Sequence, residues 1–86
     1  MKKVISAKTN DDFTLDLEFD DGKRKRFDIK PYLEVPVFRA LKNLSYFKNI
    51  KIACGTVQWQ NEQDISPDTL YLESEDITEN ETILAA

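Results

Sequence analysis

Asp28 and Asp64 are the residues of this sequence that come nearest to an acid–base pair. Two carboxylates can exchange protons with a substrate when both lie within hydrogen-bond reach of it. Asp28, however, falls at the end of an expected strand and Asp64 falls just before an expected helix cap. At such places an aspartate usually accepts hydrogen bonds from nearby backbone amides. We therefore expect structural roles for both residues and no catalytic site.

Metal and nucleophile chemistry also lack their usual residues. The sequence contains no histidine, which is the commonest general base and metal ligand, and Cys54 is its one cysteine. Asp16 to Gly22 has the acidic character of a calcium loop, but its glycine comes one position late and Phe27 stands where a bidentate glutamate is needed. Cys54 is in phase with apolar residues of an expected strand, so we expect a buried, inert thiol. The sequence predicts a protein that is not an enzyme and binds no cofactor.

Four consecutive cations, Lys23 to Arg26, form the one basic cluster. Such a cluster can bind nucleic acid, because cations that neutralise phosphates release counterions. A hairpin register that sets Arg24 opposite Glu18 and Arg26 opposite Asp16 would instead make it a charge-paired sheet surface. We favour the second interpretation and keep nucleic-acid binding as the alternative.

That register follows from the elements that position these residues. Phe13 to Phe19 alternates apolar and polar residues, as a strand with one buried face does. A two-residue loop at Asp21-Gly22 would set Leu15 opposite a charged residue, whereas a three-residue loop sets it opposite Phe27. Because a one-residue slip exchanges the two faces, we predict the three-residue loop, with Gly22 in the left-handed region.

Other elements are expected on either side of this central hairpin. Residues 1–7 contain a short first strand, and a helix of about ten residues begins at Pro36. A strand over 50–54 and a second over 56–59 follow, with Trp59 as a core anchor. Ser66 and Pro67 then predict a short helix to about residue 72. The predicted fold is α+β: a small antiparallel sheet of about four to five strands with a central hairpin, plus two or three short helices.

Charge is unevenly divided along the 86 residues. All 12 lysines and arginines lie between residues 2 and 51, whereas the chain from residue 52 onward carries eight carboxylates and no basic residue. We expect one domain over residues 1–72 and an acidic, flexible tail over 73–86. Such a tail can meet a basic surface, either on its own N-terminal half or on a partner. The residues expected to bind a partner are Glu73, Glu75, Asp76, Glu79 and Glu81.

No apolar run reaches the length needed to span a bilayer, and the lone thiol suits a reducing compartment. We therefore expect a cytoplasmic protein without a membrane partner.

The order of these elements resembles the bacterial domain-of-unknown-function family numbered 2442, over roughly residues 4–71. The positions that carry the resemblance, all expected to be structural, are Gly22, Asp28, Gly55, Trp59, Asp64, Leu70 and Tyr71. Gln60 and Glu62 depart from the family pattern, which usually has proline and glycine there.

The resemblance implies a small α+β domain without an established activity. Family members are encoded beside other small domains in toxin–antitoxin-like pairs, and longer relatives append a helix-turn-helix domain. This sequence stops before such a domain, so we expect no DNA binding through one. Together these features predict a non-enzymatic interaction module, the antitoxin-like or regulatory half of a two-protein pair, that binds a small protein with a basic surface.

Overall fold

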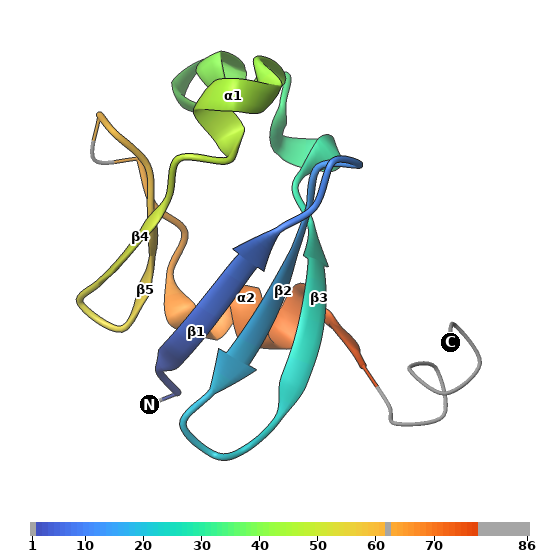
Figure 1. Ribbon diagram of the computed structural model, residues 1–86, viewed down its shortest axis with the longest axis vertical. Helices are drawn as coiled ribbons and strands as arrows, with labels where there is room; N and C mark the ends of the chain where they lie inside the picture. The colour runs from blue at the N-terminus through green and yellow to red at the C-terminus, as the bar shows by residue number, and fades with distance from the viewer. Residues whose placement is uncertain (1, 62, 78–86) are drawn as a thin grey trace.

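The computed structural model describes residues 2–61 and 63–77, which form two antiparallel sheets and several short helices (Figure 1). The larger sheet has the strand order β1-β2-β3-β6. Its strands are β1 (Val4–Thr9), β2 (Thr14–Phe19), β3 (Arg24–Asp28) and β6 (Glu75–Asp76). The predicted α+β class is confirmed, with the difference that the strands divide between a four-stranded and a two-stranded sheet.

The central hairpin has the predicted register. Leu15 pairs with Phe27, Asp16 with Arg26, and Glu18 with Arg24. The three-residue loop ends at Gly22, whose φ of +87° lies in the left-handed region that glycine adopts without steric cost. The hydrophobic alternation therefore set the pairing, because the alternative would have moved every buried side chain to the solvent face.

One face of this sheet forms the core together with α2 (Pro67–Glu73), which crosses behind the strands (Figure 1). Ser66 caps α2 by accepting a hydrogen bond from the Thr69 amide at 3.2 Å, as predicted. The largest fully buried side chains are those of Trp59, Phe19, Phe27, Phe47, Leu15, Leu17, Ile29, Leu41, Leu70, Val4 and Val57. Strands that contribute one apolar face and a helix that covers it account for the fold.

The single helix expected after Pro36 is divided into two. These are the 3₁₀ helix η2 (Pro36–Lys42) and the helix α1 (Leu44–Phe47). A further 3₁₀ helix, η1 (Lys30–Tyr32), precedes them. Asn43 between η2 and α1 is extended, and its side chain accepts a hydrogen bond from the Tyr46 amide at 3.2 Å. An asparagine that caps one helix ends the preceding one, which explains the break.

The smaller sheet consists of β4 (Lys51–Ala53) and β5 (Thr56–Gln58), which lie beside β1 (Figure 1). Cys54 and Gly55 form its two-residue turn with φ values of +53° and +76°, as in a type I′ hairpin. The prediction of a buried Cys54 is wrong, because the turn comes one residue earlier than expected and leaves the thiol exposed.

Regular structure extends past residue 72, where the sequence predicts the start of a flexible tail. Glu73 completes α2, and Glu75–Asp76 form strand β6 against β3. The flexible tail predicted from residue 73 is therefore wrong for residues 73–77. Polar composition suggested that their backbone groups would be hydrated, but pairing with a neighbouring strand satisfies them within the protein. Residues 78–86, with Glu79 and Glu81, lie outside the described part.

Candidate interaction site at the β3–β6 edge

The acidic segment after α2 lies against the basic strand of the central hairpin. Asp76 pairs with Lys25 and Glu75 with Arg26, and the Ile77 amide donates to the Arg24 carbonyl at 2.8 Å. We call this region, residues 23–26 together with 75–77, the β3–β6 edge. It brings together two segments of opposite charge that are about fifty residues apart in the sequence.

Lys25 is held on the inner side of this edge. Its ammonium group lies 4.6 Å from the centre of the Tyr71 ring and 3.0 Å from Asp76 Oδ1. The Lys25 side chain is only 12% exposed, whereas that of Asp76 is 55% exposed. The hydrogen bond and charge of Lys25 lower the pKa of Asp76. The lysine stem therefore packs on an aromatic ring while its charge reaches the rim.

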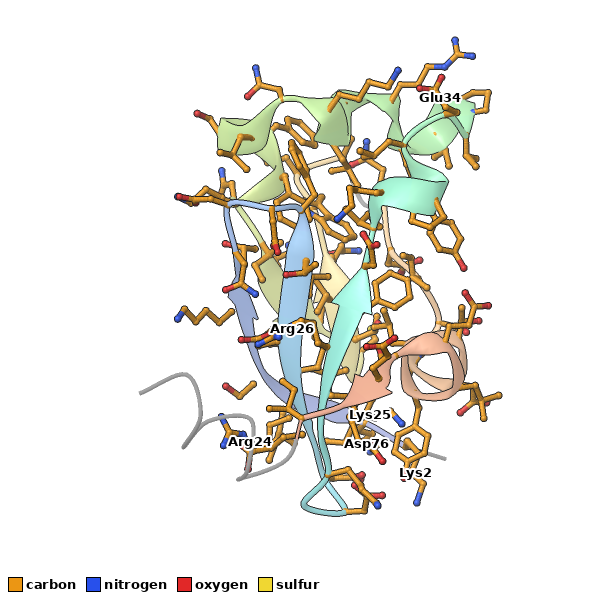
Figure 2. All side chains as sticks on the ribbon, turned by 90° about the vertical axis from the view of Figure 1, so that its right-hand side faces the viewer. Lys2, Arg24, Lys25, Arg26, Glu34 and Asp76 are labelled. Atoms are coloured by element: carbon orange, nitrogen blue, oxygen red, sulfur yellow. The ribbon has the colours of Figure 1, made fainter. Side chains whose placement is uncertain are left out.

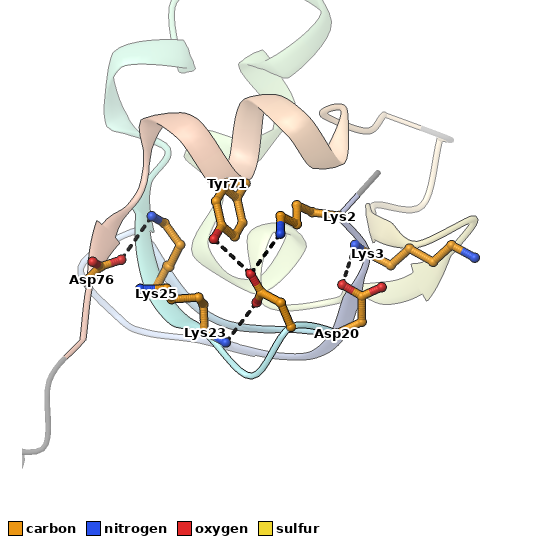
Figure 3. A network of polar contacts seen from close by, with 8 residues as sticks. Lys2, Lys3, Asp20, Lys23, Lys25, Tyr71 and Asp76 are labelled. Atoms are coloured by element: carbon orange, nitrogen blue, oxygen red, sulfur yellow. Dashed lines mark hydrogen bonds and ion pairs between the residues drawn. The ribbon is translucent and has the colours of Figure 1, made fainter.

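Tyr71 connects this edge to the hairpin turn (Figure 3). Its hydroxyl donates to Asp21 Oδ2 at 2.9 Å, and the Lys2 ammonium lies 3.1 Å from the same oxygen. The Lys23 amide donates to Asp21 Oδ1 at 2.9 Å, and this bond is the main cause that lowers the pKa of Asp21 to about 2. Asp21 is therefore a structural anion, which binds the turn to α2 and to the N-terminal segment.

The opposite face of the sheet carries Arg24 and Arg26, which point away from Lys25 and α2 (Figure 2). Cross-strand pairing places Lys8, Asp16, Arg26 and Glu75 in one row, and Glu18 and Arg24 in the next. Arg26 Nε donates to Asp16 Oδ1 at 2.7 Å. This face therefore alternates three cations with three anions. Charge pairing is confirmed for Arg26, whereas Arg24 faces Glu18 in the register without an ion pair to any described residue.

The predicted partner-binding residues are brought only partly together. The Glu73 carboxylate accepts a hydrogen bond from the Tyr32 hydroxyl, which raises the pKa of Tyr32. Glu75 and Asp76 lie in β6, one on each face of the sheet. Leu72, which the sequence did not single out, is 80% exposed beside these acidic residues.

Most of the resemblance positions have visible structural roles. Asp28 accepts a hydrogen bond from the Lys30 amide at 2.9 Å, as expected of an Asx turn. Trp59 is buried, and its indole N–H donates to the Phe47 carbonyl at 2.8 Å. Leu70 is buried against the sheet. Asp64 differs from the expectation: its backbone bridges to Gln58, but its side chain makes no hydrogen bond with the described residues.

Gln63 is a buried residue that the sequence analysis missed. Its side-chain oxygen accepts hydrogen bonds from the Tyr46 hydroxyl at 2.8 Å and the Asn61 amide at 3.2 Å, and its amide nitrogen donates to the Val37 carbonyl at 3.3 Å. A glutamine in a polar turn carries no sequence signal for this role. Its bonds nevertheless hold the Trp59 turn against the helices.

Within residues 2–61 and 63–77, no cluster of three or more acidic or cysteine side chains is arranged to hold a metal ion. The same residues contain no helix that is long and apolar enough to cross a membrane. The described geometry is thus that of a charged sheet edge with a short acidic strand bound to it.

Comparison with family models identifies the architecture. The family described as "Protein of unknown function (DUF2442)" matches residues 4–76. The chain belongs to this family. The DUF2442 match ends at Asp76 in β6, so it includes the acidic strand together with the hairpin that β6 covers. Comparison with curated proteins and with solved structures gives no match.

Proposed function

We propose that this DUF2442 chain is a cytoplasmic, non-enzymatic interaction module, the antitoxin-like or regulatory half of a two-protein pair. Its acidic C-terminal segment binds a basic surface on a small partner protein. The observation that carries the proposal is the separation of charge, with every basic residue before residue 52 and eight carboxylates after residue 51. A surface of one sign speeds association with an oppositely charged partner and makes binding sensitive to salt.

The described end of the chain has features of a protein contact. Leu72 is the most exposed large apolar side chain among the described residues, and Glu73 and Glu75 beside it are also exposed. An apolar side chain surrounded by charge is a common arrangement in interfaces, where the apolar group supplies affinity and the charges supply orientation. Binding to nucleic acid is the weaker alternative, because anions separate the cations on the open sheet face.

Affinity capture with the immobilised full-length chain tests the proposal. We expect a protein partner from the native host to be retained at about 50 mM salt. It should be released at about 500 mM salt, where interactions between charges reach over only a few ångströms. The paired substitutions Leu72→Ser and Glu75→Lys should abolish retention. Asp64→Lys, an equal charge reversal at an exposed residue away from this segment, should preserve it.

Two results would contradict the proposal. Retention of the same protein by the Leu72→Ser/Glu75→Lys variant would show that the acidic segment takes no part. Capture that disappears after nuclease treatment would instead favour nucleic acid as the ligand.

A further inference from the structure

Strand β6 is the least secured part of the main sheet. It has two residues, and both are exposed. Its attachments to β3 include the ladder pairs at Lys25 and Arg26, the bond from the Ile77 amide, and an ion pair to Lys25. Short, exposed edge strands open at the low end of the free energies found within a protein. The edge of β3 is therefore covered by a short strand that contributes no side chain to the hydrophobic core.

Opening of β6 would expose a defined set of backbone groups. The Phe19 amide of β2 donates to the Lys23 carbonyl, so the backbone groups of Lys23 face β2. The backbone groups of successive residues in a strand point alternately to its two sides. Lys25 and Phe27 therefore direct their amides toward β2, whereas Arg24 and Arg26 direct theirs toward β6. An extended chain placed beside β3 would pair with these free groups, as in strand addition to an open sheet edge.

The side chains around this edge select for acidic residues at two successive positions. Lys25 presents its charge on the inner face, and Arg24 and Arg26 present theirs on the outer face, where Arg26 also bonds Asp16. Because successive residues of a strand point to opposite faces, an incoming strand needs one carboxylate for each face. Ile77 holds the next position and lies beside a hollow of about 180 Å³ on the outer face, whose other lining residues are mostly polar. Glu75-Asp76-Ile77 fits this pattern from within the same chain.

We propose that the edge of β3 is a docking site for an extended acidic segment of a partner protein, and that β6 occupies this site in the free chain. The site goes beyond the proposed function, in which the acidic C-terminal segment binds a basic surface. Here the basic edge of β3 binds an acidic segment. The occupant is assigned by charge complementarity and by the cis strand, which shows the direction, register and residue types that fit. A partner strand would bind antiparallel to β3, with consecutive acidic residues opposite Arg26 and Lys25.

Binding of a labelled synthetic peptide, residues 74–81 of this sequence, to the full-length chain tests the proposal. Asp76→Lys sets two cations against each other and should release β6, so we expect this variant to bind the peptide at least about tenfold more tightly than the unsubstituted chain. Asp64→Lys makes the same charge change elsewhere and should bind as the unsubstituted chain does. Equal affinity of all three proteins would overturn the proposal.

A second peptide separates strand pairing from charge attraction. N-methylation at the position of Ile77 removes the amide that donates to Arg24 and preserves every carboxylate. We expect this peptide to lose at least about tenfold in affinity for the Asp76→Lys variant. Undiminished binding of the N-methylated peptide would mean that charge attraction alone suffices. Tighter binding of a single-stranded oligonucleotide than of the first peptide would assign the edge to nucleic acid. Either result would overturn the proposal.

Amide exchange in the unsubstituted chain provides a test that does not depend on a variant. The Arg26 amide should exchange at least about tenfold faster than those of Lys25 and Phe27, because of these three only the Arg26 amide is released when β6 opens. Saturating peptide should slow its exchange. Equal exchange of all three amides would show that β6 opens only with the whole sheet, and would contradict the proposal.

Discussion

Replacement of Trp59 by phenylalanine tests the largest fully buried side chain among the described residues. Trp59 is 1% exposed, and its indole N–H donates to the Phe47 carbonyl at 2.8 Å. Phe47 is the last residue of α1, where carbonyl groups have no partner within the helix. The indole therefore fills the core and satisfies a helix end at the same time.

The expected loss has two parts. A buried carbonyl left without its donor costs about 1–3 kcal/mol. The smaller ring also leaves space for roughly one to two methylene groups, at about 0.8 kcal/mol each. We expect Trp59→Phe to reduce the free energy of unfolding by about 2–4 kcal/mol. For a domain of this size, that loss lowers the melting temperature by about 10–25 °C.

Urea and thermal unfolding followed by circular dichroism measure this loss, because the variant has no tryptophan left for fluorescence. Leu72→Ala is the matched control: this side chain is 80% exposed, so the change should stay within about 0.5 kcal/mol. A Trp59→Phe loss below about 0.5 kcal/mol would refute the reasoning. It would mean that the α1 end finds another donor and that the core closes around the smaller ring.

Three further predictions concern the turns. Asp21 has a pKa of about 2 in the folded chain, below its ordinary value of 3.8, so it stabilises the fold above pH ~4 and loses this effect as the pH falls toward 2. The Asp21→Asn variant should therefore lose less stability than the unsubstituted chain in acid titrations over that interval, and an equal loss would contradict the assignment. Gly22→Ala should cost about 1 kcal/mol by urea unfolding, because φ is +87° but no atom lies within 4 Å of the added methyl group. A cost near zero would mean that the turn changes its conformation. Cys54 is exposed at a hairpin turn, so an aromatic disulfide reagent should label it fully in the native protein, whereas slow labelling limited by unfolding would show that the thiol is covered.

Local sequence patterns determined the central hairpin and the start of α2. The alternation from Leu15 to Phe19 set the hairpin register, because one buried face admits one pairing. The glycine at residue 22 marked the left-handed turn position, and Ser66 with Pro67 marked the start of α2. These signals depend on residues that are neighbours in sequence, where backbone geometry and burial leave few choices.

The tertiary structure decided the contacts between distant segments. Composition indicated that the acidic end of the chain could meet a basic surface, either on its own N-terminal half or on a partner. It did not indicate that Glu75 and Asp76 would pair with β3. Asp21 and Tyr71 likewise meet across 50 positions of sequence. Such pairs depend on where α2 crosses the sheet, which is set by the fit of the whole core and not by any local pattern. Cys54 is exposed because the turn between β4 and β5 comes one residue earlier than periodicity predicted.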